Sequence, residues 1–362
     1  MLAPVLHAPR TEMRVLEVEL DPPKAGEVSV RMTASGVCHS CLHVLDGSVG
    51  GAPMPMVLGD EGAGVVTAVG PGVTAVKPDD HVIISWAPTC GRCRYCIGGR
   101  PVLCANQPPF GYLGDGTTRM HLDGTDVHNY GPGTYAPEIV VPESCAIVIR
   151  DDMPLDVAAL IGCAVTTGVG AVVHTAAVEP GSSVAVVGCG GIGLAAVQGA
   201  RLVGASPIIA VDIADDKLER ARAVGATHTV NARDIDAVEA VRELTDGGVD
   251  YSFEAIGTKH TAEQCFAMLG RHGTATVIGM VPADAMLEIS GAALFSQEQR
   301  IQGSMMGSNR FRLDMPWFCD LYLDGRLKLD EMVTARRPLA EINEGYDVLR
   351  RGEGARTIID FL

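Results

Sequence analysis

Basic residues are scarce in this chain of 362 residues. It has 28 Lys and Arg against 44 Asp and Glu, which gives a formal net charge of −16. This excess of negative charge disfavours binding to nucleic acid or to an anionic membrane surface. Small neutral substrates remain compatible with it.

A secretory signal is also absent, because the N-terminal residues MLAPVLHAPRTEM lack a basic segment followed by an apolar one. Eleven cysteines in a chain without such a signal suit a reducing compartment. We therefore expect a cytoplasmic protein. The chain contains no internal repeat and no low-complexity segment.

One long stretch without charged residues, 157–178, is long enough to span a bilayer. Thr166, Thr167, His174 and Thr175 interrupt its apolar character, glycines loosen it, and no basic flank follows. We expect a buried pair of helices between two domains rather than a membrane span.

Four cysteines lie close together in CGRCRYCIGGRPVLC, separated by two, two and seven residues. Four thiolates close a tetrahedral zinc site and leave no position for a substrate, so the spacing predicts a structural zinc site. Three nearby arginines favour thiolate over thiol: Arg92, Arg94 and Arg100. A disulfide cluster or an iron–sulfur site is the alternative, and the missing signal disfavours it. We call these residues the cysteine lobe: Cys90, Cys93, Cys96 and Cys104.

The chain is longer than a single hydrophobic core usually serves, so two domains are expected. Residues 1 to about 80 read as short strands with Gly and Pro turns, an all-β, barrel-like pattern, and 134–149 adds two more strands. From about residue 165 strands alternate with helices, which predicts a doubly wound parallel sheet. The expected strands there are 183–187, 208–212, 250–254 and 274–278, with helices from the glycine turn to residue 203 and over 215–224.

A glycine turn follows the first of these strands. Gly188, Gly190 and Gly193 form G-x-G-x-x-G at the start of a helix, where Gly191 also lies, and this arrangement lets a pyrophosphate approach the backbone and the helix N-terminus. Asp212 ends the next strand, where a carboxylate accepts hydrogen bonds from an adenosine ribose and repels a 2′-phosphate. The pattern therefore predicts NAD rather than NADP. Lys217 is either a second ribose contact or part of a solvated helix face.

With these parts in place, the chain resembles the zinc-containing medium-chain alcohol dehydrogenases from end to end. The motifs that carry the resemblance are GVCHS at 36–40, GDEGAG at 59–64, the cysteine lobe, LIGC at 160–163, the glycine turn with Asp212, and GEGARTI at 352–358.

The resemblance implies an α/β protein in which a GroES-like, β-rich catalytic domain surrounds a Rossmann domain, with the active site in the cleft between them. It places the catalytic domain at 1–164, with the zinc lobe at 88–106, the NAD-binding domain at 165–306, and the completion of the catalytic domain at 307–362. It also implies a homodimer, or a tetramer of dimers, paired through strands near 277–281 and 301–306.

The family holds a catalytic zinc with a cysteine, a histidine and a second cysteine, leaving one open position. Cys38 and Cys163 match the two cysteines, but Asp60 stands where the histidine is expected. Glu61 matches a glutamate that lies near the metal in relatives and takes part in ligand exchange. Cys41 replaces the aspartate that orients the family's histidine. Both changes fit together, because a carboxylate ligand has no second N–H to orient.

A site rebuilt in this way holds zinc through two thiolates and one carboxylate, with Glu61 or Cys41 as further candidate ligands. The alternative is a site without metal. In the family a hydroxyl residue takes the alcohol's proton and a histidine passes it on, and Ser40 and His43 match these positions. His39 and Arg356 match positions that contact the cofactor pyrophosphate.

The resulting hypothesis is an NAD-dependent alcohol dehydrogenase that interconverts a small alcohol and its aldehyde or ketone. Three alternatives remain: a zinc-free reductase of activated C=C or C=N bonds, an enzyme with permanently bound NAD, and a non-catalytic nucleotide-binding relative. The segment 104–108 lacks the arginine with which glutathione-dependent formaldehyde dehydrogenases hold their substrate, which disfavours that activity.

Overall fold

Two units make up the part of the chain that the computed structural model describes, residues 1–361. The first contains Met1–Cys163, Arg310–Gly325 and the described residues from Val333 onward. The second contains Ala164–Asn309 and Arg326–Met332. The chain therefore leaves the first unit, completes most of the second, and returns.

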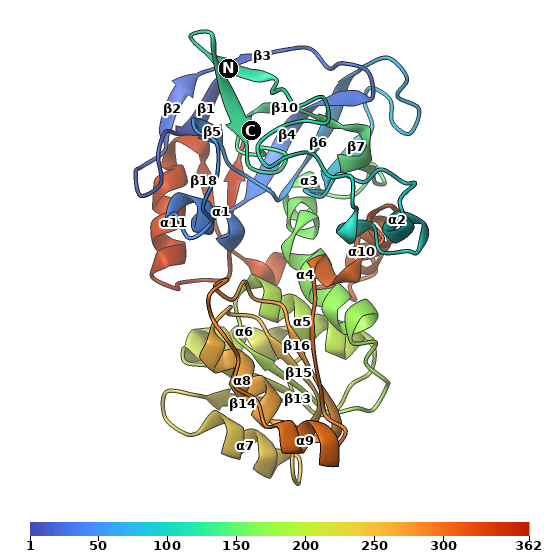
Figure 1. Ribbon diagram of the computed structural model, residues 1–362, viewed down its shortest axis with the longest axis vertical. Helices are drawn as coiled ribbons and strands as arrows, with labels where there is room; N and C mark the ends of the chain where they lie inside the picture. The colour runs from blue at the N-terminus through green and yellow to red at the C-terminus, as the bar shows by residue number, and fades with distance from the viewer. Residues whose placement is uncertain (362) are drawn as a thin grey trace. The chain divides into compact units, whose positions relative to one another are not determined.

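The first unit is mainly β-structure. One sheet has the strand order β2-β1-β5-β9-β8-β3, and a second has the order β11-β7-β6-β4-β19-β18, with β10 also paired to β4. Figure 1 shows segments from both ends of the chain, coloured blue and red, in this unit. The strands are β1 (Leu2–Leu6), β2 (Arg14–Glu17), β3 (Glu19–Leu20), β4 (Glu27–Gly36), β5 (Met56–Val57), β6 (Gly62–Val69), β7 (His81–Ile84), β8 (Met120–Leu122), β9 (Thr125–Asn129), β10 (Glu138–Pro142), β11 (Ala146–Val148), β18 (Val333–Pro338) and β19 (Arg356–Asp360).

Strand β4 holds the second sheet together. It pairs antiparallel with β6, β10 and β19, and Ile359 of β19 lies opposite Ser35 of β4. Most residues of β4 are buried, including the polar Glu27, Ser29 and Ser35, so this strand is covered on both faces for most of its length. The helices of this unit are α1 (His39–Leu45), α2 (Arg94–Ile97), α3 (Leu155–Ala158), α10 (Phe311–Leu323) and α11 (Ile342–Arg350).

Helix α1 is the main departure from the all-β pattern expected before residue 80. It begins after Cys38, whose extended backbone acts as N-cap, and it buries Cys41, Leu42, Val44 and Leu45. These spacings place the buried side chains on one helical face, but seven residues are too few for the period to stand out in the sequence.

The second unit is a parallel sheet with helices, as the alternating pattern predicts. Its strand order, β14-β13-β12-β15-β16-β17, is that of the Rossmann fold. The strands are β12 (Val184–Val187), β13 (Ile208–Asp212), β14 (His228–Asn231), β15 (Val249–Glu254), β16 (Leu269–Val277) and β17 (Arg300–Gly303). The helices are α4 (Ala164–Gly170), α5 (Gly191–Leu202), α6 (Asp215–Val224), α7 (Ala237–Leu244), α8 (Lys259–Ala267) and α9 (Gly291–Ser296).

The burial of the second unit's central strands explains why the sequence predicts them. Every residue of β12 and β13 is buried, because helices such as α5, α6 and α8 pack on the sheet (Figure 1). Strands covered on both faces are continuous apolar runs. Strand β14, with the half-polar sequence HTVN, has no such run and was not expected.

The uncharged stretch around 157–178 forms helices. Among the described residues no single helix is long and apolar enough to cross a bilayer, and only the broken pair Leu155–Gly162 and Ala164–Thr175 reaches that length and composition when its halves are counted together. From Val157 to Val172 its residues are buried.

Candidate metal and nucleotide sites

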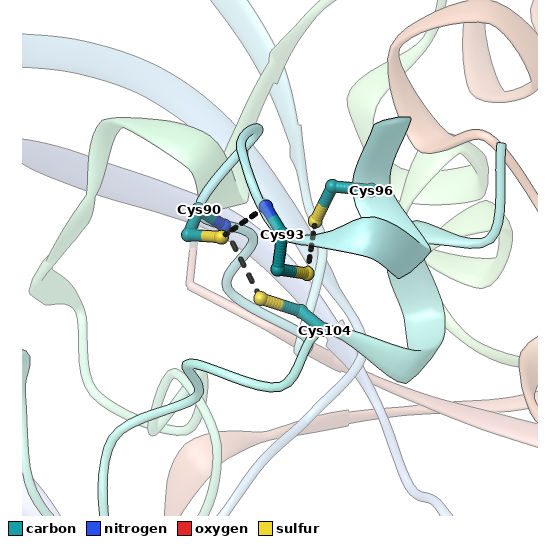
Figure 2. Close-up of side chains that lie close together, drawn as sticks. All are labelled: Cys90, Cys93, Cys96 and Cys104. Carbon is teal, nitrogen blue, oxygen red and sulfur yellow. Dashed lines mark hydrogen bonds between the residues drawn. The ribbon is translucent and has the colours of Figure 1, made fainter. Parts of the chain in front are cut away.

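The cysteine lobe brings its four sulfurs together. Its ligand atoms lie within 4.8 Å of one another, and Figure 2 shows the sulfurs turned toward a common centre. Cys93 Sγ lies 3.5 Å from Cys96 Sγ, and the Cys90 backbone N–H donates to Cys104 Sγ at 3.3 Å. All eleven cysteines are free of disulfides in the structure. The donor set fits a closed tetrahedral zinc site.

Backbone groups, more than the neighbouring arginines, favour thiolate at Cys90 and Cys93, whereas burial raises the pKa of Cys96 to about 12. The pKa of Cys90 falls to about 6, chiefly through a hydrogen bond from the Arg92 backbone N–H and also through the Asn106 side chain. Arg94, expected to act by its charge, stacks over the Tyr95 ring at 4.5 Å. The expected cause was therefore incomplete, because sequence spacing does not show which N–H groups point at a sulfur.

A second set of ligand atoms lies in the first unit. Cys38, Asp60 and Cys163 are buried, and their ligand atoms lie within 4.8 Å of one another. We call these three residues the Asp60 cluster. Cys38 caps α1, Asp60 lies between β5 and β6, and Cys163 follows a short 3₁₀ turn, Ala159–Gly162. Each ligand therefore stands at the end of a regular element.

Backbone geometry fixes the middle ligand. Gly59 has φ +114°, and a Cβ there would lie 2.5 Å from Thr134 Oγ1. Only glycine suits that combination of left-handed backbone and close contact. Gly59 therefore sets the direction in which the chain presents Asp60.

Distances within the Asp60 cluster fit a metal. Cys38 Sγ lies 3.7 Å from Cys163 Sγ, and Cys163 Sγ lies 4.0 Å from Asp60 Oδ2. Two sulfurs on one tetrahedral zinc, each at about 2.3 Å, lie roughly 3.8 Å apart. Burial raises the pKa of Asp60, and hydrogen bonds from Ser40, Cys38 and Cys41 partly oppose this effect. A bound cation would offset the cost of burying this carboxylate with two thiolates.

Ser40 lies directly against the cluster. Its Oγ donates to Asp60 Oδ2 at 2.5 Å and lies 2.9 Å from Cys38 Sγ. His43 lies one helical turn further along α1, and its ring centroid is 5.2 Å from that of His39. The structure thus brings Ser40 to the candidate metal site and pairs His43 with His39.

Glu61 points elsewhere. It is fully buried, and its Oε2 lies 3.8 Å from Arg356 Nη2. Arg356 is 6% exposed and also donates to Val37 O at 3.3 Å. The carboxylates of Glu61 and Asp60 and the two cluster thiols raise the pKa of Arg356, although burial itself lowers it. The set of three close ligand atoms does not include Glu61.

Sequence reasoning missed the surroundings of Cys41. This thiol is fully buried and donates to Asp60 Oδ1 at 3.5 Å. Tyr346 and Tyr135, both fully buried, lie behind it with their hydroxyl oxygens 2.7 Å apart. These tyrosines are 211 residues apart in the chain, so no local pattern connects them.

The glycine turn lies in the second unit between β12 and α5. Gly188 has φ +93°, and a Cβ on Gly193 would lie 1.7 Å from Gly188 O. A Cβ on Gly190, by contrast, would meet no atom within 4 Å. Gly190 caps α5, so the open space lies at the N-terminus of that helix, with Gly191 as its first residue. This cradle fits a pyrophosphate.

Asp212 ends β13 beside the turn. Its Oδ2 accepts from the Cys189 backbone N–H at 2.7 Å, and its Oδ1 accepts from Ile213 and Ala214 at 2.7 and 3.1 Å. These bonds hold the carboxylate against the glycine turn, where an adenosine ribose would meet it. Lys217 lies in the first half of α6.

Two family models match the chain. A model described as "Alcohol dehydrogenase GroES-like domain" matches residues 24–151, and one described as "Zinc-binding dehydrogenase" matches residues 191–320.

Curated relatives match over nearly the whole chain. An S-(hydroxymethyl)glutathione dehydrogenase of Paracoccus denitrificans is 41% identical, with 96% of each chain covered. An NDMA-dependent alcohol dehydrogenase of Amycolatopsis methanolica is 40% identical, with 99% of this chain and 98% of the relative covered.

Solved structures agree. An alcohol dehydrogenase zinc-binding domain protein of Burkholderia ambifaria has a TM-score of 0.95 at 34% identity, covering 99% of this chain and 98% of its own. A benzyl alcohol dehydrogenase of Acinetobacter calcoaceticus has a TM-score of 0.95 at 31% identity, and the match covers 100% of this chain and 99% of that one.

Proposed function

The chain belongs to the zinc-binding alcohol dehydrogenase family, and we propose that it is an NAD-dependent, zinc-containing enzyme that interconverts an alcohol and its aldehyde or ketone. The observation that carries this proposal is the buried Asp60 cluster, in which two thiols and one carboxylate converge within 4.8 Å. Three protein ligands and one open position are the arrangement of a catalytic zinc site. The cysteine lobe, with four thiols, is assigned to structural zinc.

Different side chains of the first unit are assigned to metal binding and to proton transfer. Bound zinc supplies a Lewis acid for the substrate oxygen and NAD accepts the hydride. Cys38, Asp60 and Cys163 hold the metal. Ser40 Oγ, bonded to Asp60 and Cys38, stands where it can take the alcohol's proton, and His43 is assigned as the next carrier by family resemblance.

Cofactor binding is assigned to the second unit. Gly188, Gly190, Gly191 and Gly193 form the pyrophosphate cradle, and Asp212 receives the adenosine ribose and disfavours a 2′-phosphate. We assign supporting contacts to three further side chains by family resemblance alone: Lys217, His39 and Arg356.

The first test of this proposal is metal content. Elemental analysis of the purified protein should give two zinc ions per chain, and Asp60→Asn should retain one, because an amide is a much poorer zinc ligand than a carboxylate. Alcohol oxidation with NAD should fall by at least about 100-fold in Asp60→Asn, since the site would lose its Lewis acid.

Asp46→Asn is a matched control for the loss of one carboxylate near α1, since Asp46 bonds Ser48 outside the cluster. It should keep both zinc ions. One zinc per chain in the unaltered protein, together with reduction of activated C=C or C=N bonds, would favour the zinc-free reductase. Tight NADH binding with two zinc ions but no hydride transfer would favour a non-catalytic relative.

A second candidate keeps NAD permanently bound and passes electrons to an external acceptor. One relative of 40% identity is named an NDMA-dependent alcohol dehydrogenase, which motivates this variant. Denaturing the purified protein and measuring the released nicotinamide cofactor distinguishes the two candidates. Release of about one equivalent per chain supports permanently bound NAD, and release of no cofactor supports exchangeable NAD.

The substrate is proposed to be a small alcohol rather than a glutathione adduct. One relative is named S-(hydroxymethyl)glutathione dehydrogenase, but Cys104–Ala105–Asn106–Gln107–Pro108 contains no arginine for an adduct carboxylate. We further propose a cytoplasmic homodimer or homotetramer, a catalytic domain of residues 1–164 and 307–362, and an NAD-binding domain of residues 165–306.

A further inference from the structure

The two oxygens of Asp60 face different partners. Oδ2 accepts from Ser40 at 2.5 Å and is the oxygen near Cys163, at 4.0 Å from its Sγ. Oδ1 accepts from Cys41 Sγ at 3.5 Å. The carboxylate therefore presents one oxygen to the other ligands and holds the second against α1.

Cys41 belongs to a longer chain of hydrogen bonds. The Gly59 backbone and the Tyr346 hydroxyl lie within hydrogen-bonding reach of its sulfur. Tyr135 Oη donates to Gly36 O at 3.1 Å, so Tyr346 Oη donates to Tyr135 Oη at 2.7 Å. The two tyrosine rings meet edge to face, with centroids 6.2 Å apart.

All three donors are shielded from water. Cys41, Tyr135 and Tyr346 are each 0% exposed. Each group has one proton to donate: Tyr135 donates to Gly36 O, Tyr346 to Tyr135, and Cys41 to Asp60 Oδ1. Cys41 is therefore the group whose proton reaches the carboxylate, and the two bonded hydroxyls lie behind it.

We propose that Cys41, with Tyr346 and Tyr135 packed behind it, is a positioning residue that holds Asp60 so that Oδ2 alone is offered to the metal, and that Cys41 is not itself a ligand. The inference rests on the proposed function, since it requires a metal at the Asp60 cluster. It accounts for the cysteine at position 41, because a carboxylate ligand needs a donor beside it where a histidine ligand needs an acceptor.

The geometry separates Cys41 from the ligands. Cys38, Asp60 and Cys163 form a set of close ligand atoms that does not include Cys41. Cys41 also lies on the buried face of α1, with Leu42, Val44 and Leu45, whereas Cys38 lies at the start of the helix. A thiol donor at this place orients the carboxylate without adding a third negative sulfur.

The test measures binding of cobalt(II), the probe metal, at the second site of the full-length protein after the cysteine lobe has been filled with zinc. Cys41→Ala and Tyr346→Phe remove the donor and the hydroxyl behind it. We expect cobalt affinity to fall by about tenfold or more in Cys41→Ala and by a smaller factor in Tyr346→Phe, the range found when groups that orient a metal ligand are lost. Cys41→Ser keeps a donor and should recover most of the affinity.

The thiolate-to-cobalt charge-transfer band provides a second readout. Two thiolates, Cys38 and Cys163, predict an unchanged band intensity per bound cobalt in Cys41→Ala, whereas a ligand role for Cys41 predicts a loss of about one third. Cys145→Ala is the control for the loss of a buried thiol and Tyr112→Phe the control for the loss of a partly buried hydroxyl in the same unit, and both should bind cobalt as the unaltered protein does.

Failure of the inference and of the proposed function are distinct results. Two metals per chain with unchanged affinity in Cys41→Ala and Tyr346→Phe, or a band reduced by about one third in Cys41→Ala, would overturn the positioning role alone. An unaltered protein that binds metal only in the cysteine lobe would overturn both.

Discussion

Asp60 changes the charge of the candidate metal site. Two thiolates and a carboxylate carry three negative charges, one more than two thiolates and a neutral imidazole. Arg356 is a buried cation whose charge acts on Asp60, and its guanidinium lies 3.8 Å from Glu61 Oε2. An aspartate at this position therefore comes with a fixed positive charge close by, and the two residues are best altered and interpreted together.

Asp212 offers a prediction at the same scale. Asp212→Asn removes the negative charge. It also places an NH₂ group, which cannot accept a hydrogen bond, opposite at least one of the three backbone N–H groups that donate to Asp212. The KM for NAD should rise about tenfold, since hydrogen bonds to a charged group contribute about 1.5–3 kcal/mol. Discrimination against NADP should shrink, as the ratio of kcat/KM values measures.

Asp215→Asn, in the first turn of α6, is the control, because Asp215 bonds Asn231 outside the glycine turn. It should leave the KM for NAD unaltered. An Asp212→Asn enzyme with the same cofactor preference as the unaltered one would contradict the assignment of Asp212 to the ribose.

Single residues differ in how far the sequence predicts them. Cys38, Asp60 and Cys163 could be grouped because each stands in a recognisable motif, and the structure brings their ligand atoms together. The Tyr346–Tyr135 contact could not be predicted, since tertiary packing alone joins residues so distant in the chain. The contact between Cys41 and Asp60 likewise depends on side-chain direction, which motif spacing does not give.

The turn between β12 and α5 shows how closely one element constrains its neighbour. A Cβ on Gly193, in the first turn of α5, would lie 1.7 Å from Gly188 O, so this turn packs tightly against the residue that follows β12. The space next to Gly190 is open at the same helix end. Gly193 thus serves the packing of the helix, and Gly190, three residues earlier, leaves space for a ligand.

Two alanine substitutions test this separation. Gly193→Ala places a methyl 1.7 Å from Gly188 O and should lower the free energy of unfolding by about 1–3 kcal/mol, as overpacking does. Gly190→Ala meets no atom within 4 Å and should change that free energy by less than about 0.5 kcal/mol. Urea unfolding without cofactor measures both.

Cofactor titration then completes the comparison. Gly190→Ala should raise the Kd for NAD, because its methyl occupies the approach to the helix N-terminus. Equal stability losses for both variants, or unaltered NAD binding by Gly190→Ala, would contradict the assigned roles.

Elements were predictable where burial leaves a clear pattern. Ile208–Asp212 and Asp215–Val224 have the expected bounds, because a strand buried on both faces and a capped helix each have a distinct composition. Helix α1 was missed because it is short, and β14 because its residues are half polar. Tertiary packing decides the structure of such segments.

At the scale of the whole molecule, an ion network centred on the buried pair Arg119–Glu27 joins the two sheets of the first unit. Arg119, 1% exposed, precedes β8 and donates to both oxygens of Glu27 at the start of β4. Asp115 bonds the same guanidinium at 2.9 Å and also Lys24. A charged pair of this kind is costly to break from one side, because the partner stays buried.

The network predicts a pH dependence of stability. Hydrogen bonds from Lys24, the largest cause, and from Thr117 and Arg119 hold the pKa of Asp115 well below its ordinary value of about 3.9. A lowered pKa in the folded state contributes stability that is present above the ordinary pKa and is lost as pH falls toward the folded value.

Asp115→Asn should therefore be less stable than the unaltered protein at pH 5–7, and the difference should shrink below about pH 4. Urea unfolding of both proteins across this range measures it. Asp126→Asn, an exposed carboxylate beside His121, is the control and should show a smaller difference at neutral pH. A gap that persists unchanged to pH 2.5 would exclude Asp115 as its source.

Strand β19 pairs with β4, and α11 supplies Tyr346, so segments from far apart in the chain complete one sheet. Translation produces Cys38, Asp60 and Cys163 before Tyr346 and Arg356. Until β19 emerges from the ribosome, the edge of β4 that it will cover stays open. The nascent chain therefore carries the metal ligands before it carries Arg356, the cation that offsets their charge, and before it carries Tyr346, which packs behind Cys41.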